Sequence, residues 1–250
     1  MSQFLATHTV PGTPQDLSPS PVTIPGTLAT SSAGPNTREG SVALTGTGTQ
    51  FTASKFQFNW WTGGFTFEAW VNYPNFTNTV GLSPAVNSFG NMQTSGNINA
   101  WSFGPTTTGQ LTFYYYSGSP YTFISSSALT AGAWTHVCVQ HDGTNLYLYI
   151  NGVSVAGPLA VSGLATITSG YFSIGQYDGP TYPGPTFQTG DVRMVTGATV
   201  YPVSGFTPPS GPLGLATSGT TVILLQVPLI KGTSFMSNTG TGQKAAMWHS

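Results

Sequence analysis

Charged residues are almost missing from this chain. They make up 4% of its 250 residues, against roughly 25% in an ordinary soluble domain. The five Lys and Arg residues are scattered and the net charge is −1, so no basic stripe is available for nucleic acid or an anionic membrane surface. Aromatic residues reach 13%, which is enough for a packed core and argues against a disordered chain.

Cysteine pairs and long apolar runs are also missing. Cys138 is the only cysteine, so the chain can form no intrachain disulfide, and we expect a buried, inert thiol. The longest apolar run, Val222–Leu225, is far shorter than the roughly 18 residues of a membrane helix. The first residues lack the basic start and apolar stretch of a secretory signal. These features suggest a protein that is assembled inside a cell and later exposed outside it.

No segment shows a capped helix with an apolar stripe, whereas short alternating segments separated by Gly, Pro or Asn are frequent. The pattern predicts an all-β fold in which two antiparallel sheets pack face to face as a jelly-roll sandwich. Prolines deny residues 1–36 any long strand, so we expect an extended N-terminal arm, either disordered or packed on a neighbour. The domain is expected at 37–228 and a C-terminal extension at 229–250.

The clearest strands flank a polar corner between Ala133 and Gly152. Trp134–Gln140 and Leu146–Ile150 alternate, and Asn151-Gly152 is a typical hairpin turn. In the second run aliphatic residues occupy one face and Tyr147 and Tyr149 the other. We therefore expect a sheet with one buried and one solvated face.

Four segments resemble laminin-G-like domains, which have the concanavalin A-like jelly-roll fold. The later part of the fourth segment is similar to the variant found in phage and large-virus structural proteins. The resemblance covers about residues 40–227. The segments are Gly40–Gly46, F-T-F-E-A-W-V at Phe65–Val71, W-T-H-V through I-N-G at Trp134–Gly152, and Phe172–Pro209.

The residues for enzyme chemistry are sparse. Glycosidases of this superfold need two carboxylates beside the scissile bond, yet the chain has six acids and none is a close neighbour of Glu68. His136 and the other histidines show no metal-ligand spacing with Cys138. Asp191 and Arg193, two residues apart, are expected to form a local ion pair. We therefore expect no enzymatic activity.

Calcium is the cofactor that the resemblance raises, because many laminin-G-like domains bind it at a loop rim. Asp142 and Asp178 are the loop acids of the domain, and calcium prefers six to eight oxygen ligands. Each aspartate also precedes a glycine and can simply shape its turn. We favour turn formation and no cofactor, with calcium at Asp142 or Asp178 as the alternative.

Neutral hydrogen-bonding groups and aromatic rings are the chemistry that glycans need, because Tyr and Trp combine an apolar face with a polar tip. The same rings can instead fill the core or a subunit interface. The candidate glycan-binding residues are Trp101, Tyr115, Tyr121, Tyr177 and Tyr182.

Two functions remain in view. The first is a non-enzymatic virion structural protein, such as a capsid decoration, fibre or minor shell component. It would contact copies of itself and other virion proteins on the particle surface, and glycan binding could accompany it. The second is a lectin or adhesin module that binds cell-surface glycans for host attachment. No nucleic acid and no membrane insertion are expected in either case.

Overall fold

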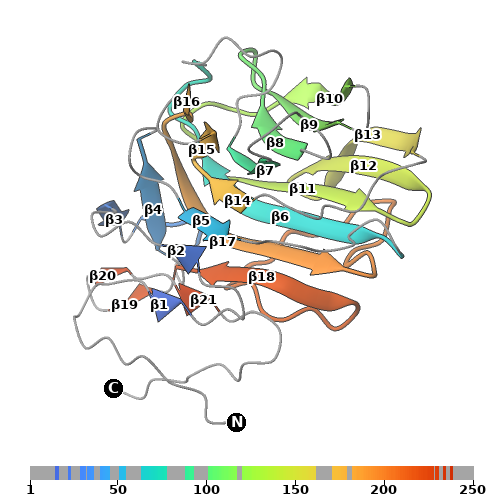
Figure 1. Ribbon diagram of the computed structural model, residues 1–250. Coiled ribbons are helices and arrows are strands. Elements are labelled where there is room, and N and C mark those ends of the chain that lie inside the picture. The colour runs from blue at the N-terminus through green and yellow to red at the C-terminus, as the bar shows by residue number, and fades with distance from the viewer. Residues whose placement is uncertain are drawn as a thin grey trace.

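Two large β-sheets pack face to face in the computed structural model of the chain (Figure 1). The structure describes residues 15–16, 22–23, 29–31, 33–36, 40–45, 51–54, 63–77, 88–92, 101–116, 120–161, 171–178, 182–227, 229–230, 233–234 and 237–238. These residues form strands and connections and no helix, and none of them belongs to an apolar helix of membrane-spanning length. The predicted all-β jelly-roll sandwich is confirmed.

The larger sheet has ten strands and is antiparallel except for the pair β1 and β21. Its main path runs β1-β21-β18-β17-β6-β11-β12-β13, with β4 beside β17 and β3 beside β4. Its strands are β1 (Gln15–Asp16), β3 (Ala29–Ser31), β4 (Ser41–Leu44), β6 (Phe65–Asn72), β11 (Thr135–His141), β12 (Asn145–Ile150), β13 (Val153–Ala160), β17 (Phe187–Thr196), β18 (Thr220–Gln226) and β21 (Ser237–Asn238).

The smaller sheet has seven strands in the order β10-β9-β8-β7-β14-β5-β2. Its strands are β2 (Val22–Thr23), β5 (Phe51–Ser54), β7 (Phe89–Met92), β8 (Trp101–Pro105), β9 (Gln110–Tyr116), β10 (Pro120–Ala128) and β14 (Tyr171–Ile174). Two small ribbons complete the strands: β15 (Gln176–Asp178) with β16 (Tyr182–Pro183), and β19 (Leu229–Ile230) with β20 (Thr233–Ser234).

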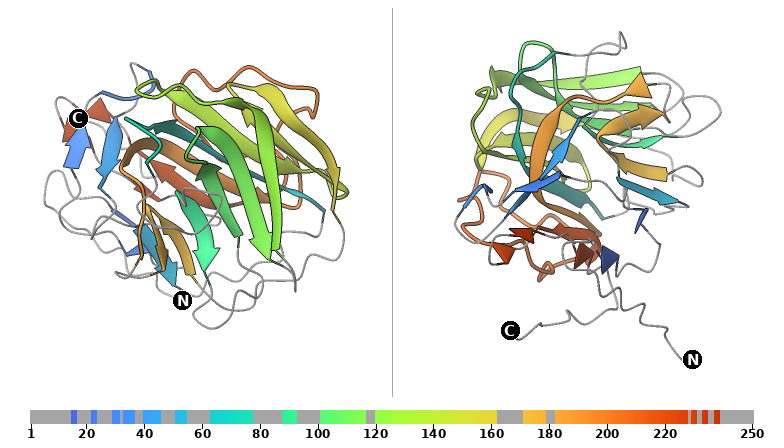
Figure 2. Two further views of the ribbon diagram at one scale, coloured as in Figure 1. Left: turned by 90° about the horizontal axis from the view of Figure 1, so that it is seen from above. Right: turned by 90° about the vertical axis from the view of Figure 1, so that its left-hand side faces the viewer.

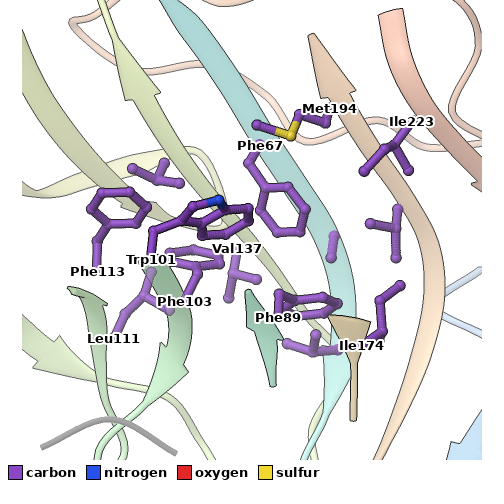
Figure 3. Packing of buried hydrophobic residues seen from close by; sticks show 14 of the residues in the cluster. Phe67, Phe89, Trp101, Phe103, Leu111, Phe113, Val137, Ile174, Met194 and Ile223 are labelled. Atoms are coloured by element: carbon purple, nitrogen blue, oxygen red, sulfur yellow. The ribbon is translucent and has the colours of Figure 1, made fainter. Parts of the chain in front are cut away.

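The core lies between the sheets and is rich in aromatic rings (Figure 3). Phe67 of β6 lies at its centre, with its ring centroid 5.1–6.2 Å from those of Phe89, Trp101, Phe103 and Phe172. Such edge-to-face and tilted pairs stabilise a core beyond their burial, by about 0.5–1.5 kcal/mol each. Phe65, Phe67, Ala69 and Val71 share this inner face, because side chains alternate along β6.

The opposite face of the larger sheet differs from the prediction. Tyr149 is fully buried and Tyr147 is nearly so, although a solvated face was expected there. The reason is residues 197–219, which we call the strap: they connect β17 to β18 and cross this outer face. The Tyr149 hydroxyl donates to the Val203 carbonyl at 3.0 Å, and Phe206 packs against the Tyr149 ring.

Short pieces of the predicted arm and extension pair with the sandwich. β2 pairs with β5, β3 with β4, and β21 with β18. The paired strands β1 and β21 and the ribbon β19–β20 lie at one end of the body, next to β18 (Figures 1 and 2). The boundaries proposed at 36/37 and 228/229 stay predictions.

Candidate functional site

The most polar cluster of the described residues is buried beneath the strap. Glu68 of β6 is fully buried, and its carboxylate accepts hydrogen bonds from Arg193, His136 and Tyr201. The Arg193 Nε lies 2.8 Å from Oε1, and the Tyr201 hydroxyl lies 2.7 Å from Oε2. Side chains from β6, β11, β17 and the strap thus meet at one carboxylate.

The electrostatics of Glu68 reflect these partners. Burial alone would raise the pKa of Glu68, but the hydrogen bond and charge of His136, with the charge of Arg193, outweigh it. The pKa of Glu68 is therefore lowered from its ordinary value of 4.5.

The expected ion pair between Asp191 and Arg193 is wrong. Arg193 pairs with Glu68, while the Asp191 carboxylate accepts hydrogen bonds from the backbone N–H groups of Leu213 and Val227. Hydrogen bonds from two backbone N–H groups favour the ionised form of a carboxylate.

The strap seals this cluster from solvent. The backbone of the strap is hydrogen-bonded to side chains of the sheet. The Val200 N–H donates to the Thr66 hydroxyl oxygen, and the Tyr201 N–H donates to the Gln140 side-chain oxygen. The Phe206 ring stacks on Tyr201 at 3.8 Å between centroids. Because Glu68 and His136 are both 0% exposed, a substrate cannot reach them without removal of the strap. The cluster is therefore structural, and its residues came from the very segments that carried the family resemblance.

Asp142 shapes its turn, as favoured from the sequence. Its carboxylate accepts hydrogen bonds from the backbone N–H groups of Thr144 and Asn145 and from the Tyr147 hydroxyl. These bonds lower the pKa of Asp142 against the opposing effect of burial. Among the described residues, no group of three or more His, Cys, Asp or Glu side chains could hold a metal ion. The side chain of Asp178, at the end of β15, lies outside the described residues.

Three of the five glycan candidates meet on one row of the smaller sheet. Tyr115 of β9 lies directly opposite Trp101 of β8 on one side and Tyr121 of β10 on the other. We call these three residues the aromatic row. The row depends on strand register, because one residue of slip would turn a ring to the opposite face.

Exposure rises along the aromatic row from the core to the sheet edge. Trp101 is fully buried and Tyr115 is 5% exposed, whereas Tyr121 is 48% exposed. The Tyr115 and Tyr121 rings stack with 4.8 Å between centroids and 7° between planes. Trp101 is thus a core residue that no external glycan can contact, because its ring lies between the sheets (Figure 3). Tyr121 is the member that a ligand can reach.

The edge position of β10 explains this exposure. β10 ends the order of the smaller sheet, and β13 ends that of the larger one. The two lie beside each other (Figure 1), where the Ser126 hydroxyl donates to the Val155 carbonyl at 2.9 Å. Tyr121 is near the other end of β10, so β13 does not cover it.

The remaining two candidates occupy a separate ribbon. Tyr182 lies in β16 opposite Asp178 of β15, and Tyr177 is the neighbour of Asp178. Their side chains lie outside the described residues, so their role as glycan contacts stays a prediction.

Comparison with known families shows to which superfamily this chain belongs. The sequence profile described as "Concanavalin A-like lectin/glucanases superfamily" matches residues 45–196. The chain belongs to this superfamily. No curated protein sequence matches it.

Several solved structures share the fold of this superfamily member. Domain 4 of AbnA, a GH43 extracellular arabinanase from Geobacillus stearothermophilus, solved in complex with arabinotriose, is 17% identical, with a TM-score of 0.54 over 72% of this chain and 83% of that chain. The botulinum neurotoxin serotype G binding domain is 12% identical, with a TM-score of 0.53 over 89% and 60%. The binding domain of Paraclostridial Mosquitocidal Protein 1 is 14% identical, with a TM-score of 0.50 over 68% and 42%. The chain thus matches less than two thirds of each toxin domain, and these likenesses show the fold.

Proposed function

We propose that this protein is a non-enzymatic carbohydrate-binding module in which Tyr121, supported by Tyr115, is the stacking surface for a sugar ring. The observation that carries the proposal is the half-exposed Tyr121 ring stacked on the buried Tyr115 ring at the end of the aromatic row. A tyrosine whose orientation is fixed by a neighbour loses little conformational freedom when a sugar packs on it. Tyr121 therefore offers an apolar face and a hydroxyl that is already in position.

The described carboxylates support a binding role over hydrolysis. A glycosidase requires an acid and a second carboxylate about 5–10 Å apart around an accessible bond. Glu68 and Asp191 are fully buried, and each accepts hydrogen bonds from protein groups. Asp142 is exposed, but it is engaged by its own turn. The arabinotriose bound in the AbnA complex is a further reason to test oligosaccharides first.

Glycan binding to immobilised oligosaccharides, arabinotriose among them, tests the proposal. Tyr121→Ala should weaken binding by about tenfold or more, equivalent to about 1.4 kcal/mol, whereas Tyr121→Phe should retain most of it because the ring remains. Ile124→Ala is the matched control. Ile124 lies on the same strand and is 42% exposed, but strand alternation places it on the opposite face. Equal binding by wild type and Tyr121→Ala would reject the proposal.

Self-assembly is the second candidate function. Four of the exposed large apolar residues lie on the two edge strands: Tyr121 and Ile124 on β10, and Val153 and Leu159 on β13. Neither strand contains a charged residue, whereas edge strands of monomeric proteins are commonly protected by Lys. Each strand does contain one proline, Pro120 in β10 and Pro158 in β13. A second copy of the chain could pair along β13 without charge repulsion. The virion location, the partnership with other virion proteins and the phage-like variant of the family remain predictions from the sequence.

Light scattering tests this assembly role. Val153→Lys places a charge at a residue that is 64% exposed, so it should convert an oligomer into a monomer without loss of folding. A monomeric wild-type protein would reject the assembly role and leave the glycan proposal unaffected.

A further inference from the structure

The smaller sheet is free of charge over its whole width. Its seven strands contain no Asp, Glu, Lys, Arg or His. The strands nearest the aromatic row, β8, β9 and β10, lie within the stretch between Glu68 and Asp142, in which no Asp, Glu, Lys or Arg occurs. These strands therefore offer a ligand at Tyr121 hydroxyls, amides and aromatic rings, and no charged side chain.

We infer that the ligand of the Tyr115–Tyr121 surface is a neutral oligosaccharide, and that sugars carrying carboxylate or sulfate are rejected. This inference rests on the proposed function and specifies its ligand class. Recognition of a carboxylate sugar ordinarily uses Arg or Lys, because a charge that loses water without a partner is strongly destabilised. The aromatic row supplies no such partner.

The nearest charges in the sequence are already engaged elsewhere. Glu68 is buried beneath the strap, on the far face of the other sheet, and Asp142 is held by Thr144, Asn145 and Tyr147. Of the five Lys and Arg residues, Arg193 is the one whose side chain the structure describes, and it is bound to Glu68. Among the described residues, no cation is available to pair with an acidic sugar at Tyr121.

The Tyr121 side chain suits sugar hydroxyls instead. It is 48% exposed and carries a hydroxyl, which can both donate and accept hydrogen bonds. Burial raises the pKa of Tyr115 above its ordinary value of 10.0, and the neighbouring Tyr121 adds to this. The strands of this sheet contain no Asp, Glu or His, the residue types whose usual pKa values lie nearest the interval from about pH 5 to pH 8. Binding should change little with pH over this interval and little with salt, because no charged contact is screened.

Paired oligosaccharides that differ in charge test the inference. Immobilised N-acetyllactosamine is compared with its sialylated form, and methyl-esterified oligogalacturonate with the free acid. For each pair, binding of wild type, Tyr121→Ala and Ile124→Ala is measured at low salt and at about 0.5 M salt. We expect the neutral member to bind at least about tenfold more tightly, with a change of less than about twofold across the salt range.

The outcomes separate the ligand class from the proposed function. Tyr121-dependent binding of neutral members alone supports both. Tyr121-dependent binding that is equal or stronger for the acidic members, or that falls steeply with salt, overturns the neutral ligand class and leaves carbohydrate binding in place. No Tyr121-dependent binding to any member overturns the proposed function and this inference with it. Unchanged circular dichroism and thermal midpoints of both variants show that the surface alone has changed.

Discussion

Glu68 and Arg193 form a buried ion pair between directly opposite residues of neighbouring strands, with 2.6 Å between Oε1 and Nη2. Arg193 also donates to the Gly214 carbonyl and the Tyr201 hydroxyl, both in the strap. The pair thus joins β6 and β17 to the segment that covers them. In a chain with so few charges, this buried pair links the sheet to the strap.

Removal of one partner should be strongly destabilising. In Glu68→Gln the Arg193 guanidinium stays buried without its counter-charge, so we expect the free energy of unfolding to fall by about 3–5 kcal/mol. Urea denaturation measures this change. The double variant Glu68→Leu, Arg193→Met is the control, because it removes both charges and should recover much of the loss. A change below about 1 kcal/mol in Glu68→Gln would mean that the pair does not hold the strap.

The lowered pKa of Glu68 predicts how stability depends on pH. The folded-state pKa lies below the ordinary value of 4.5, so the ionised carboxylate stabilises the fold above that value. This contribution is lost as the pH falls through the folded-state pKa, because the folded protein must then take up the proton. Urea denaturation between about pH 7 and pH 3 should therefore show a steeper loss of stability in wild type than in the Glu68→Leu, Arg193→Met double variant. Parallel curves would contradict the assignment.

The sequence was sufficient for the clearest strands but not for what covers them. Alternation placed Phe67 and Leu148 in the core correctly, because local pattern determines which face is apolar. It failed for Tyr149, which was expected in solvent, because the covering strap comes from a segment more than fifty residues away. β13 was not predicted, since Gly157 and Pro158 interrupt its pattern.

For the candidate site as well, the sequence suggested residue types but not their positions in the sheet. Tyr115 and Tyr121 could be selected by residue type, and the sequence also selected Trp101. Only the strand register shows that Trp101 is at the buried end of their row and Tyr121 at the exposed end. The partner of Arg193 was wrong for a related reason: Asp191 is close along the chain, but Glu68 is opposite in the sheet.

Cys138 should report the opening of the strap. It is fully buried on the outer face of β11, in a cluster with Tyr149 and Phe206, and burial raises the pKa of its thiol well above the usual value of 9.0. Because the thiolate is the reactive form, we expect negligible labelling by a thiol reagent in the native protein and complete labelling in urea. Glu68→Gln should label faster than wild type at a denaturant concentration where both remain folded. Rapid labelling of the native wild type would show that the strap does not protect this face.

The contact between Gly152 and Phe206 of the strap provides a second test of what holds the strap on the sheet. Its backbone has a φ of +75°, and its carbonyl accepts the Phe206 N–H at 2.9 Å. A Cβ at this position would overlap the Phe206 carbonyl oxygen. Gly152→Ala should therefore combine the cost of a left-handed alanine, about 1 kcal/mol, with displacement of the strap.

Gly143→Ala separates these two effects. Gly143 has a φ of +97°, but a Cβ there meets nothing within 4 Å, so this variant carries the backbone cost alone. Thermal unfolding should rank wild type above Gly143→Ala and Gly143→Ala above Gly152→Ala. Only Gly152→Ala should also accelerate Cys138 labelling, because only that substitution pushes against Phe206. Equal labelling rates in the two variants would mean that the Gly152–Phe206 contact does not hold the strap on the sheet.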